Sequence, residues 1–338
     1  MKLRSVVSVV DANPGGKSAP PSSGRSGRAD PGTAGVRPSS PPKNRRWNGR
    51  TRRDAWTFVL FAAPNVILIV LFTYRPLLTN FYFSTLDWTL GAANATSVGL
   101  GNYVEFFTSS DAPTVLGTTV IFTAITVGGA MALGLLIALA LNQRLKGRTF
   151  ARAVVFAPYV LSGVGVGLVW LFIFDPTYGA LSWFLRSLGQ ASPQWVNDPK
   201  LALVMVIVVY VWKNLGYCAV VYLAGLQSIQ PQLMEAAALD GASGFRRFRS
   251  IVVPLLSPTT FFLLITSLLS SLQAFDIIRI MTPSGNGTST LIFESYLQAF
   301  GSYNRAGYSA AISVVLFLGL LVMTAVQLRF VERKVHYS

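Results

Sequence analysis

Very few residues of this chain have the types and spacing that catalysis or metal binding requires. Gly16–Ser18 matches the end of a phosphate-binding loop, but Asp11 stands where that motif needs glycine, and no strand precedes it. His336 is the single histidine and has no companion ligands, while the one cysteine, Cys218, lies in an apolar run where packing is its expected role. Because the apolar runs also lack paired carboxylates, we predict no catalytic residue, metal site or cofactor on this chain.

Lys213 is an ionisable residue about midway along the apolar run 201–225. A charged side chain at that depth in a membrane is costly and is by default a sign of function. One interpretation is a cation that faces a cavity on a solute path, where it would suit an anionic solute. The other is a structural lysine that bonds backbone carbonyls or snorkels. We take Trp212, Asn214 and Asp276 together with Lys213 as candidate residues of the solute path.

A polar, alanine-rich stretch follows this run and predicts a short helix around Glu235, with good helix formers from Leu233 to Leu239. Pro231 fits a first helical turn, Glu235 lies near the positive end of the helix dipole, and Gly241 can take the left-handed conformation that ends a helix. The three alanines at 236–238 project little, so another surface can approach the backbone closely. A second short helix is expected from Gly244. The stretch is either a solvated interfacial helix or a docking element.

The spacing of this stretch resembles the signature loop of permease subunits in binding-protein-dependent ABC importers. That loop reads Glu-Ala-Ala, three residues, Gly, nine residues, Ile, one residue, an aliphatic residue and Pro. The matching positions, with the neighbouring aspartate, are Glu235, Ala236, Ala237, Asp240, Gly241, Ile251 and Pro254. Val253 stands where leucine is usual. The resemblance runs from about residue 55 to the C-terminus, and it implies that these residues couple the membrane domain to an ATPase without being catalysts.

The composition is that of a membrane protein with several spans. Of the 338 residues, 52% are hydrophobic and 12% are charged, whereas soluble domains carry about 25% charged residues. A helix needs ~20 apolar residues to cross a bilayer, and six runs come near that length: 55–76, 115–141, 153–174, 201–225, 257–275 and 306–330. We predict an all-α integral membrane protein with six transmembrane helices and a cytoplasmic coupling helix between helices four and five. Gly163, Gly165 and Gly167 predict a small-residue packing face on the third run.

Residues 1–54 are rich in Pro, Gly, Ser and basic residues, which predicts a disordered tail rather than a signal peptide. We expect the membrane domain to span 55–338. With the tail inside, the inner segments hold 22 of the 28 Lys and Arg residues and the outer segments hold five. Since basic residues favour the cytoplasmic side, we expect both termini and the Glu235 loop there, in a multi-pass protein of the bacterial inner membrane.

The basic residues between Lys43 and Arg53 directly precede the first apolar run. A cluster at this place is attracted to anionic lipid, so we expect the tail to lie near such lipid. The net charge of +15 therefore reflects membrane topology, and we predict no nucleic-acid partner.

The family resemblance also implies partners and a solute class. Such permeases work with a second homologous permease, with two ATP-binding subunits that hold the ATP and magnesium, and with an external solute-binding protein. Val211–Lys213 and Val331–Tyr337 are most similar to permeases that take up glycerol 3-phosphate or glycerophosphodiesters, and neutral sugars stay open as an alternative. The Gly-rich segment 282–291 is similar to the external loop that faces the binding protein in sugar-type importers. Its usual double glycine followed by proline is not intact, and a plain flexible loop is the alternative.

A second function class is an ion-gradient-driven secondary transporter of a small polar solute. Such a protein would need acidic residues within the membrane, and none falls within the six predicted spans. An intramembrane enzyme would need a nucleophile with its base, or clustered metal ligands, and the runs lack both. These considerations favour the importer permease.

Overall fold

The computed structural model describes residues 49–143 and 146–331, and the chain divides into two units after Phe61, so that the described part of the first unit is residues 49–61. Residues 1–48, which are most of the predicted tail and include the first part of its basic run, lie outside the described residues. The first unit contributes the start of helix α1 (Gly49–Ile69), which begins before the predicted end of the tail at residue 54. Residues 49–54 contain three arginines and no proline, so the end of the predicted tail favours a helix.

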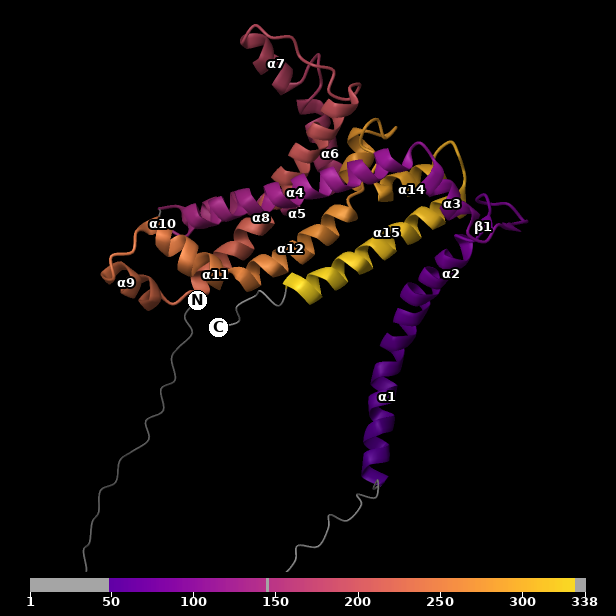
Figure 1. The fold of residues 1–338 in the computed structure, drawn as a ribbon, viewed down its shortest axis with the longest axis horizontal. Coiled ribbons are helices and arrows are strands. Elements are labelled where there is room, and N and C mark those ends of the chain that lie inside the picture. Colours follow the sequence, from indigo (N-terminus) through magenta and orange to yellow (C-terminus); the bar gives the residue numbers. More distant parts are fainter. Residues whose placement is uncertain (1–48, 144–145, 332–338) are drawn as a thin grey trace, which may run out of the picture. The chain divides into compact units, whose positions relative to one another are not determined.

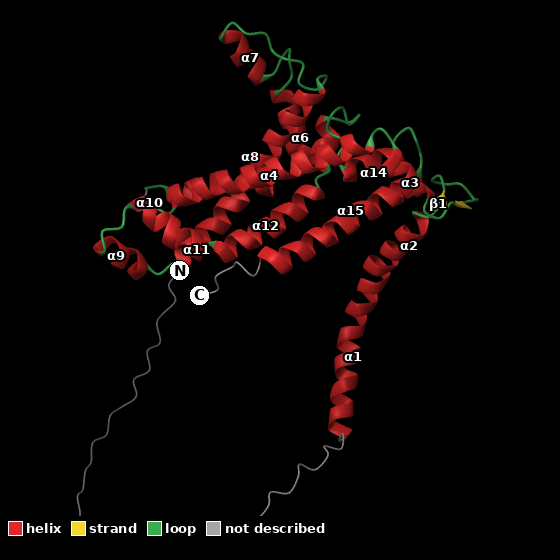
Figure 2. Cartoon of the chain, in the orientation of Figure 1, coloured by secondary structure: helices red, strands yellow, loops and turns green. Residues whose placement is uncertain are grey.

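The second unit is built almost wholly of helices (Figures 1 and 2). Its long helices are α4 (Ala112–Leu141), α8 (Pro199–Ser228), α12 (Ser257–Leu272) and α15 (Ala306–Val326). Its shorter helices are α2 (Arg75–Phe83), α3 (Gly101–Thr108), α5 (Arg148–Val160), α6 (Gly163–Ile173), α7 (Ala180–Ser187), α9 (Pro231–Leu239), α10 (Gly244–Arg247), α11 (Val253–Leu255), α13 (Asp276–Met281) and α14 (Leu291–Phe300). Two short strands, β1 (Leu86–Asp87) and β2 (Thr96–Ser97), pair antiparallel with Leu86 opposite Ser97. Single π-helical turns occupy Val70–Tyr74, Phe248–Val252 and Gln327–Val331.

Five helical segments of the described residues are long and apolar enough to cross a membrane. They are Asp54–Phe83, Ala112–Leu141, Pro199–Ser228, Ser257–Met281 and Ala306–Arg329. The prediction of an all-α membrane fold is confirmed, and each of these segments matches a predicted span. Ser257–Met281 is longer than the predicted span 257–275 and includes Asp276, and Asp54–Phe83 begins with Asp54. The expectation that the spans lack acidic residues is therefore wrong for these two segments.

The third predicted span, 153–174, is not one helix. It consists of α5 and α6, which are bent by 99° at a short break. Pro158 lies near the end of α5, and Leu161 is extended with φ −67° and ψ 146°. A proline removes one N–H and its ring disfavours the preceding helical turn, and the extended Leu161 then ends the helix. Six spans result only if this bent pair counts as one.

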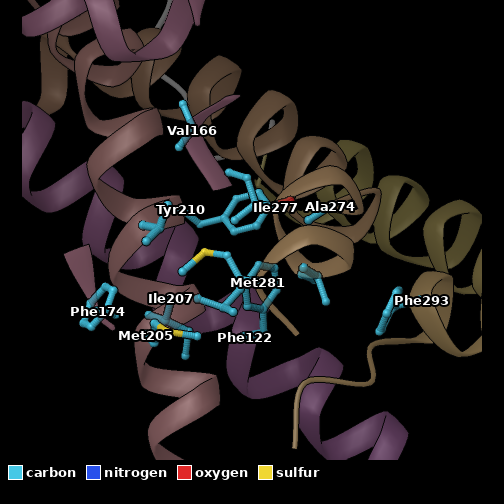
Figure 3. Packing of buried hydrophobic residues seen from close by; sticks show 13 residues of the cluster. Phe122, Val166, Phe174, Met205, Ile207, Tyr210, Ala274, Ile277, Met281 and Phe293 are labelled. Carbon is cyan, nitrogen blue, oxygen red and sulfur yellow. The ribbon is translucent and has the colours of Figure 1, made fainter. Parts of the chain in front are cut away.

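The core of the second unit lies where α8 packs against its neighbours. α4 and α8 make the most extensive helix pair, and a Cβ on Gly134 of α4 would lie only 2.5 Å from the Cβ of Cys218. Figure 3 shows a second region of the core, in which Phe122 of α4, Tyr210 of α8 and Ile277 of α13 pack together. These close contacts fix α13 and α4 on α8, which is the helix that carries Lys213.

The second unit has two distinct ends in Figure 1. α9, α10 and α11 lie at one end, and α3, α14 and β1 lie at the other. Between them run α4, α8, α12 and α15, while α6 leaves the line of these helices and leads to α7. α9 and the predicted outer segments that carry β1 and α14 therefore lie at opposite ends of these four helices, whereas the predicted outer segment 175–200 stands off with α7.

Of the three glycines predicted to form a packing face, two do so. A Cβ on Gly163 would lie 2.9 Å from the Cβ of Asp276, and one on Gly167 would lie 3.0 Å from the Cβ of Ile280. At Gly165, no atom of the described residues lies within 4 Å of that position. Residues four apart share a helix face whereas residues two apart do not, so the prediction is wrong for Gly165.

Candidate functional site

α9 carries part of the predicted signature and ends as its sequence predicts. Pro231 is in its first turn, and none of its residues is buried. Gly241 N–H donates to Ala238 O at 3.1 Å, and Ala242 N–H donates to Ala237 O at 3.0 Å. Gly241 has a φ of +75°, the left-handed conformation that this capping motif requires. The helix end is thus completed by its own chain, and the helix surface stays open.

Glu235 lies at the edge of a groove of about 480 Å³ that α9 forms with the end of α8 and with α10. Met234 and Ala238 from α9 and Arg247 from α10 also line this groove. The Glu235 and Asp240 side chains are exposed, and neither makes a hydrogen bond or ion pair within the described part of the chain. Both carboxylates are therefore available to another molecule.

Ile251 and Pro254 lie apart from the exposed face of α9. The chain passes from α10 through the π-helical turn Phe248–Val252 into α11, and Val252 and Leu256 are buried in a cluster with residues of α4 and α8. Ile251 and Pro254 are half-buried beside them. The signature residues thus fall into two groups: those on or just after the exposed α9, and those in the half-buried segment that leads to α12. Their coupling role stays a prediction.

Lys213 contacts the break between α5 and α6. Its ammonium donates hydrogen bonds to the backbone oxygens of Pro158, Tyr159 and Leu161, at 3.3, 2.9 and 2.7 Å. It also lies over the Tyr159 ring, 5.7 Å from the centroid. This geometry corresponds to the interpretation of a lysine that bonds backbone carbonyls.

Two spaces adjoin one another near Lys213. Lys213 and Asp276 line a cavity of about 290 Å³ with Gly163, Gln273 and Ser270. A narrower crevice shares Tyr210 and Ser270 with this cavity, and its lining includes Asn214. The structure therefore brings three of the four predicted path residues to one region, at the junction of α8, α12 and α13.

Trp212 is the exception among the predicted path residues. Its ring meets Trp170 of α6 edge to face, with centroids 5.3 Å apart, and it packs against the hydrophobic cluster around Met205 and Ile277. Successive residues of a helix point in different directions, so Trp212 faces the core while Lys213 faces the cavity.

The sequence analysis missed the hydroxyl groups of the narrow crevice. Thr126 Oγ1 and Ser271 Oγ lie 2.8 Å apart and join α4 to α12, and the Tyr217 hydroxyl donates to Thr266 Oγ1 at 3.3 Å. Ser270 lines the same crevice. The signal available in the sequence is the pair of adjacent serines within an apolar run, which places polar groups at membrane depth.

A larger cavity of about 600 Å³ lies at the opposite end from α9, between the segment 283–289, α14 and the start of α4. Arg279 lies over the Tyr296 ring, 5.4 Å from its centroid, and its Nε donates to the Tyr296 hydroxyl at 3.3 Å. Asn286 Nδ2 donates to Val196 O and Asn197 O, at 3.0 and 2.9 Å. The segment is thus fastened to the start of α8, which differs from the plain flexible loop that was the alternative.

Within residues 49–143 and 146–331, no three His, Cys, Asp or Glu side chains are grouped so that they could hold a metal ion. The polar side chains of the cavities are instead hydroxyls, amides and single charges. Such groups can form hydrogen bonds with a polar solute.

Comparison with known proteins gives this arrangement its context. The family model described as binding-protein-dependent transport system inner membrane component matches residues 130–336. The chain is 38% identical to the sn-glycerol-3-phosphate transport system permease protein UgpA of Agrobacterium fabrum, over 82% of this chain and 96% of that protein. It is 36% identical to the protein of the same name from Rhizobium meliloti, over 82% and 96%, and 33% identical to that from Yersinia pestis, over 84% and 97%.

Two solved structures share the fold. One is a bacterial ABC transporter involved in the import of the acidic polysaccharide alginate, with a TM-score of 0.74 at 22% identity, covering 84% of this chain and 97% of that chain. The other is a bacterial alginate ABC transporter in complex with alginate pentasaccharide-bound periplasmic protein, with a TM-score of 0.71 at 22% identity, covering 85% and 99%.

Proposed function

Because the chain belongs to the family of binding-protein-dependent transport system inner membrane components, we propose that it forms half of the membrane path of an ATP-driven importer for a glycerol phosphate or a related sugar-type solute. The observation that carries the solute class is the similarity to three permeases named for sn-glycerol-3-phosphate, each matched over more than nine tenths of its length. The cavity beside Lys213 and Asp276 supports a polar solute, since it joins charged groups to serine and amide side chains.

The partners follow from the same proposal. The importer has two ATP-binding subunits, which hold the ATP and magnesium, and one of them docks on α9. The exposed Glu235 and Asp240 support this because neither is engaged within the described residues. A second homologous permease completes the path. A solute-binding protein meets the opposite end, where the 600 Å³ cavity and the segment 283–289 lie.

The orientation is also part of the proposal. The basic loops around residues 142–152 and 226–256 face the cytoplasm, as do both termini. The basic run before the first span attracts anionic lipid of the inner leaflet. Reporter fusions at the two termini, read for cytoplasmic activity, test this orientation independently of any transport measurement.

The proposed function is tested by what the chain brings with it from its native membrane. We expect a tagged chain, solubilised gently, to co-purify with a second permease and an ATPase that carries a phosphate-binding loop. The binding protein of that system should bind sn-glycerol 3-phosphate more tightly than maltose in calorimetry. Preference for maltose would overturn the solute class. Isolation of the chain as a homo-oligomer without an ATPase would favour the ion-driven transporter instead.

A further inference from the structure

The break between α5 and α6 leaves backbone carbonyls short of donors. The last four carbonyls of a helix have no partner within it, and the extended Leu161 leads the chain away without a turn that would supply one. An unpaired carbonyl is strongly unfavourable in the hydrocarbon of a membrane. Irregular backbone at this depth therefore needs a partner from another element.

Lys213 supplies these donors from α8. Its ammonium has three N–H groups and no acceptor, and it contacts three carbonyls, those of Pro158, Tyr159 and Leu161. Each N–H therefore has one carbonyl, and none is left for a solute. No ion pair joins Lys213 to Asp276 among the described residues, although both line the same cavity.

Two glycines allow α5 and α6 to approach different neighbouring helices closely. Gly216, almost one turn beyond Lys213 on α8, faces α5, since a Cβ there would lie 2.1 Å from Val155 O. Gly163 at the start of α6 faces Asp276 of α13. α5 is thus seated on α8 and α6 on α13, and the carbonyls at their junction converge on Lys213.

We propose that Lys213 is a positioning residue that sets the angle between α5 and α6 and so shapes the cavity beside Asp276, and that it does not bind the solute through its charge. The carbonyls occupy the whole hydrogen-bonding capacity of the ammonium, and the two glycine contacts hold them there. The transport measurement below rests on the proposed function, whereas the distance measurement does not.

The first test asks whether Lys213 acts through its hydrogen-bond donors or through its positive charge. The reconstituted importer is the sample, and uptake of sn-glycerol 3-phosphate is measured. We expect Lys213→Met to lower the maximal uptake rate at least tenfold with KM within twofold of the native value. Lys213→Gln, which is neutral but donates two N–H groups, should keep at least threefold more activity than Lys213→Met. Lys200→Met, at the exposed start of the same helix, is the matched control and should keep native rates. A tenfold rise in KM with an unchanged maximal rate, or equal loss in the Met and Gln variants, would overturn the proposal.

The second test measures the distance between α5 and α6 across the break, and it needs no solute. Spin labels replace Val154 on α5 and Phe172 on α6, both exposed, in a Cys218→Ser background. A straight helix would separate these positions by ~27 Å along its axis, and a bend of 99° brings them closer. We expect Lys213→Met to move the measured distances toward the straight value and Lys213→Gln to do so less. Identical distances in all three chains would refute a positioning role, even if the importer carries a different solute.

Discussion

The last backbone carbonyls of a helix need hydrogen-bond donors, and two helices of this permease, α9 and α5, obtain them in opposite ways. At the end of α9, Gly241 and Ala242 turn back and donate their own N–H groups to the last carbonyls. At the end of α5, the donors come from Lys213, more than fifty residues further along the chain. One cap is local and the other is made between helices.

The environments explain the difference. α9 has no buried residue, so water can satisfy any carbonyl that its cap leaves free. α5 ends within the membrane-spanning part, where each carbonyl needs a protein donor. A change at α9 should therefore act on what the helix binds, and a change around α5 should act on whether the fold forms. The predictions below test this contrast, beginning with the largest effect.

Gly216→Ala should have the largest effect. The added Cβ would lie 2.1 Å from a backbone oxygen of α5, and the backbone cannot move aside as a flexible side chain can. Forced overpacking costs about 1–3 kcal/mol, and here it also separates Lys213 from its carbonyls. We expect a lower thermal unfolding midpoint in detergent and a lower yield. Gly165→Ala, where no atom lies within 4 Å, should keep both values, and equal behaviour of the two variants would contradict the contact.

Gly241→Val should leave the membrane core intact and reduce uptake. Its surroundings are empty, with nothing within 4 Å of an added Cβ, but its φ is +75°. A side chain in that conformation costs about 1–2 kcal/mol, and a β-branched one disrupts the end of α9. We expect at least a fivefold loss of uptake at an unchanged level of the chain in the membrane, with ATP hydrolysis no longer stimulated by solute.

Gly241→Asn is the matched control for this variant, because asparagine tolerates the left-handed region. It should retain most of the uptake. Full solute-stimulated hydrolysis in Gly241→Val would argue against a docking role for α9.

The same contrast explains what could be predicted from the sequence. The short helix around Glu235, its glycine cap and the second helix from Gly244 depend on neighbouring residues, and the structure has all three. The third span was predicted as a single run over 153–174 in which Pro158 could kink the helix, whereas the size of the bend was not predicted. Its angle depends on Lys213 and Gly216, whose partners on α5 are far away in the sequence.

The candidate solute path shows the same limit. Lys213 was identified from its charge at membrane depth, and Asp276 from its place beside the external segment. The crevice formed by Thr126, Ser270 and Tyr217 was missed, because hydroxyl residues are common in membrane helices and only the packing of α4, α8 and α12 makes them converge. Trp212 was included as a neighbour of Lys213, and helical geometry turns it toward Trp170 instead.

Glu235→Lys should have a smaller effect than either glycine change, and it should appear only in assembly. The side chain is exposed and unengaged within the described residues, so we expect the unfolding midpoint to stay within the error of the native value. The amount of ATPase that co-purifies should fall several-fold, since the carboxylate that faces the partner becomes a cation. Gln232→Lys, an exposed position on the same helix, should change neither value. Lowered stability in Glu235→Lys would mean that α9 depends on contacts within this chain.

The smallest effect is expected at the far end of the molecule, where Glu105 of α3 pairs with Arg305 before α15. The guanidinium donates to both carboxylate oxygens, at 2.7 and 2.6 Å, and this hydrogen bonding lowers the pKa of Glu105 below its ordinary value of 4.5. A lowered pKa in the folded state adds stability that is present above pH 4.5 and is lost as the pH falls through the lowered value. Both side chains are partly exposed, so the pair contributes about 0–1 kcal/mol.

Glu105→Gln should therefore lower the unfolding midpoint slightly at pH 7, and the difference from the native chain should shrink as the pH falls below 4.5. High salt should shrink it as well, because exposed charges are screened. Asp111→Asn removes another exposed acidic side chain near the same end and controls for the loss of one negative charge at pH 7. A difference for Glu105→Gln that stays constant over the range would mean that the pair acts through its packing on Tyr308, whose ring centroid lies 4.3 Å from the guanidinium, and not through its charge.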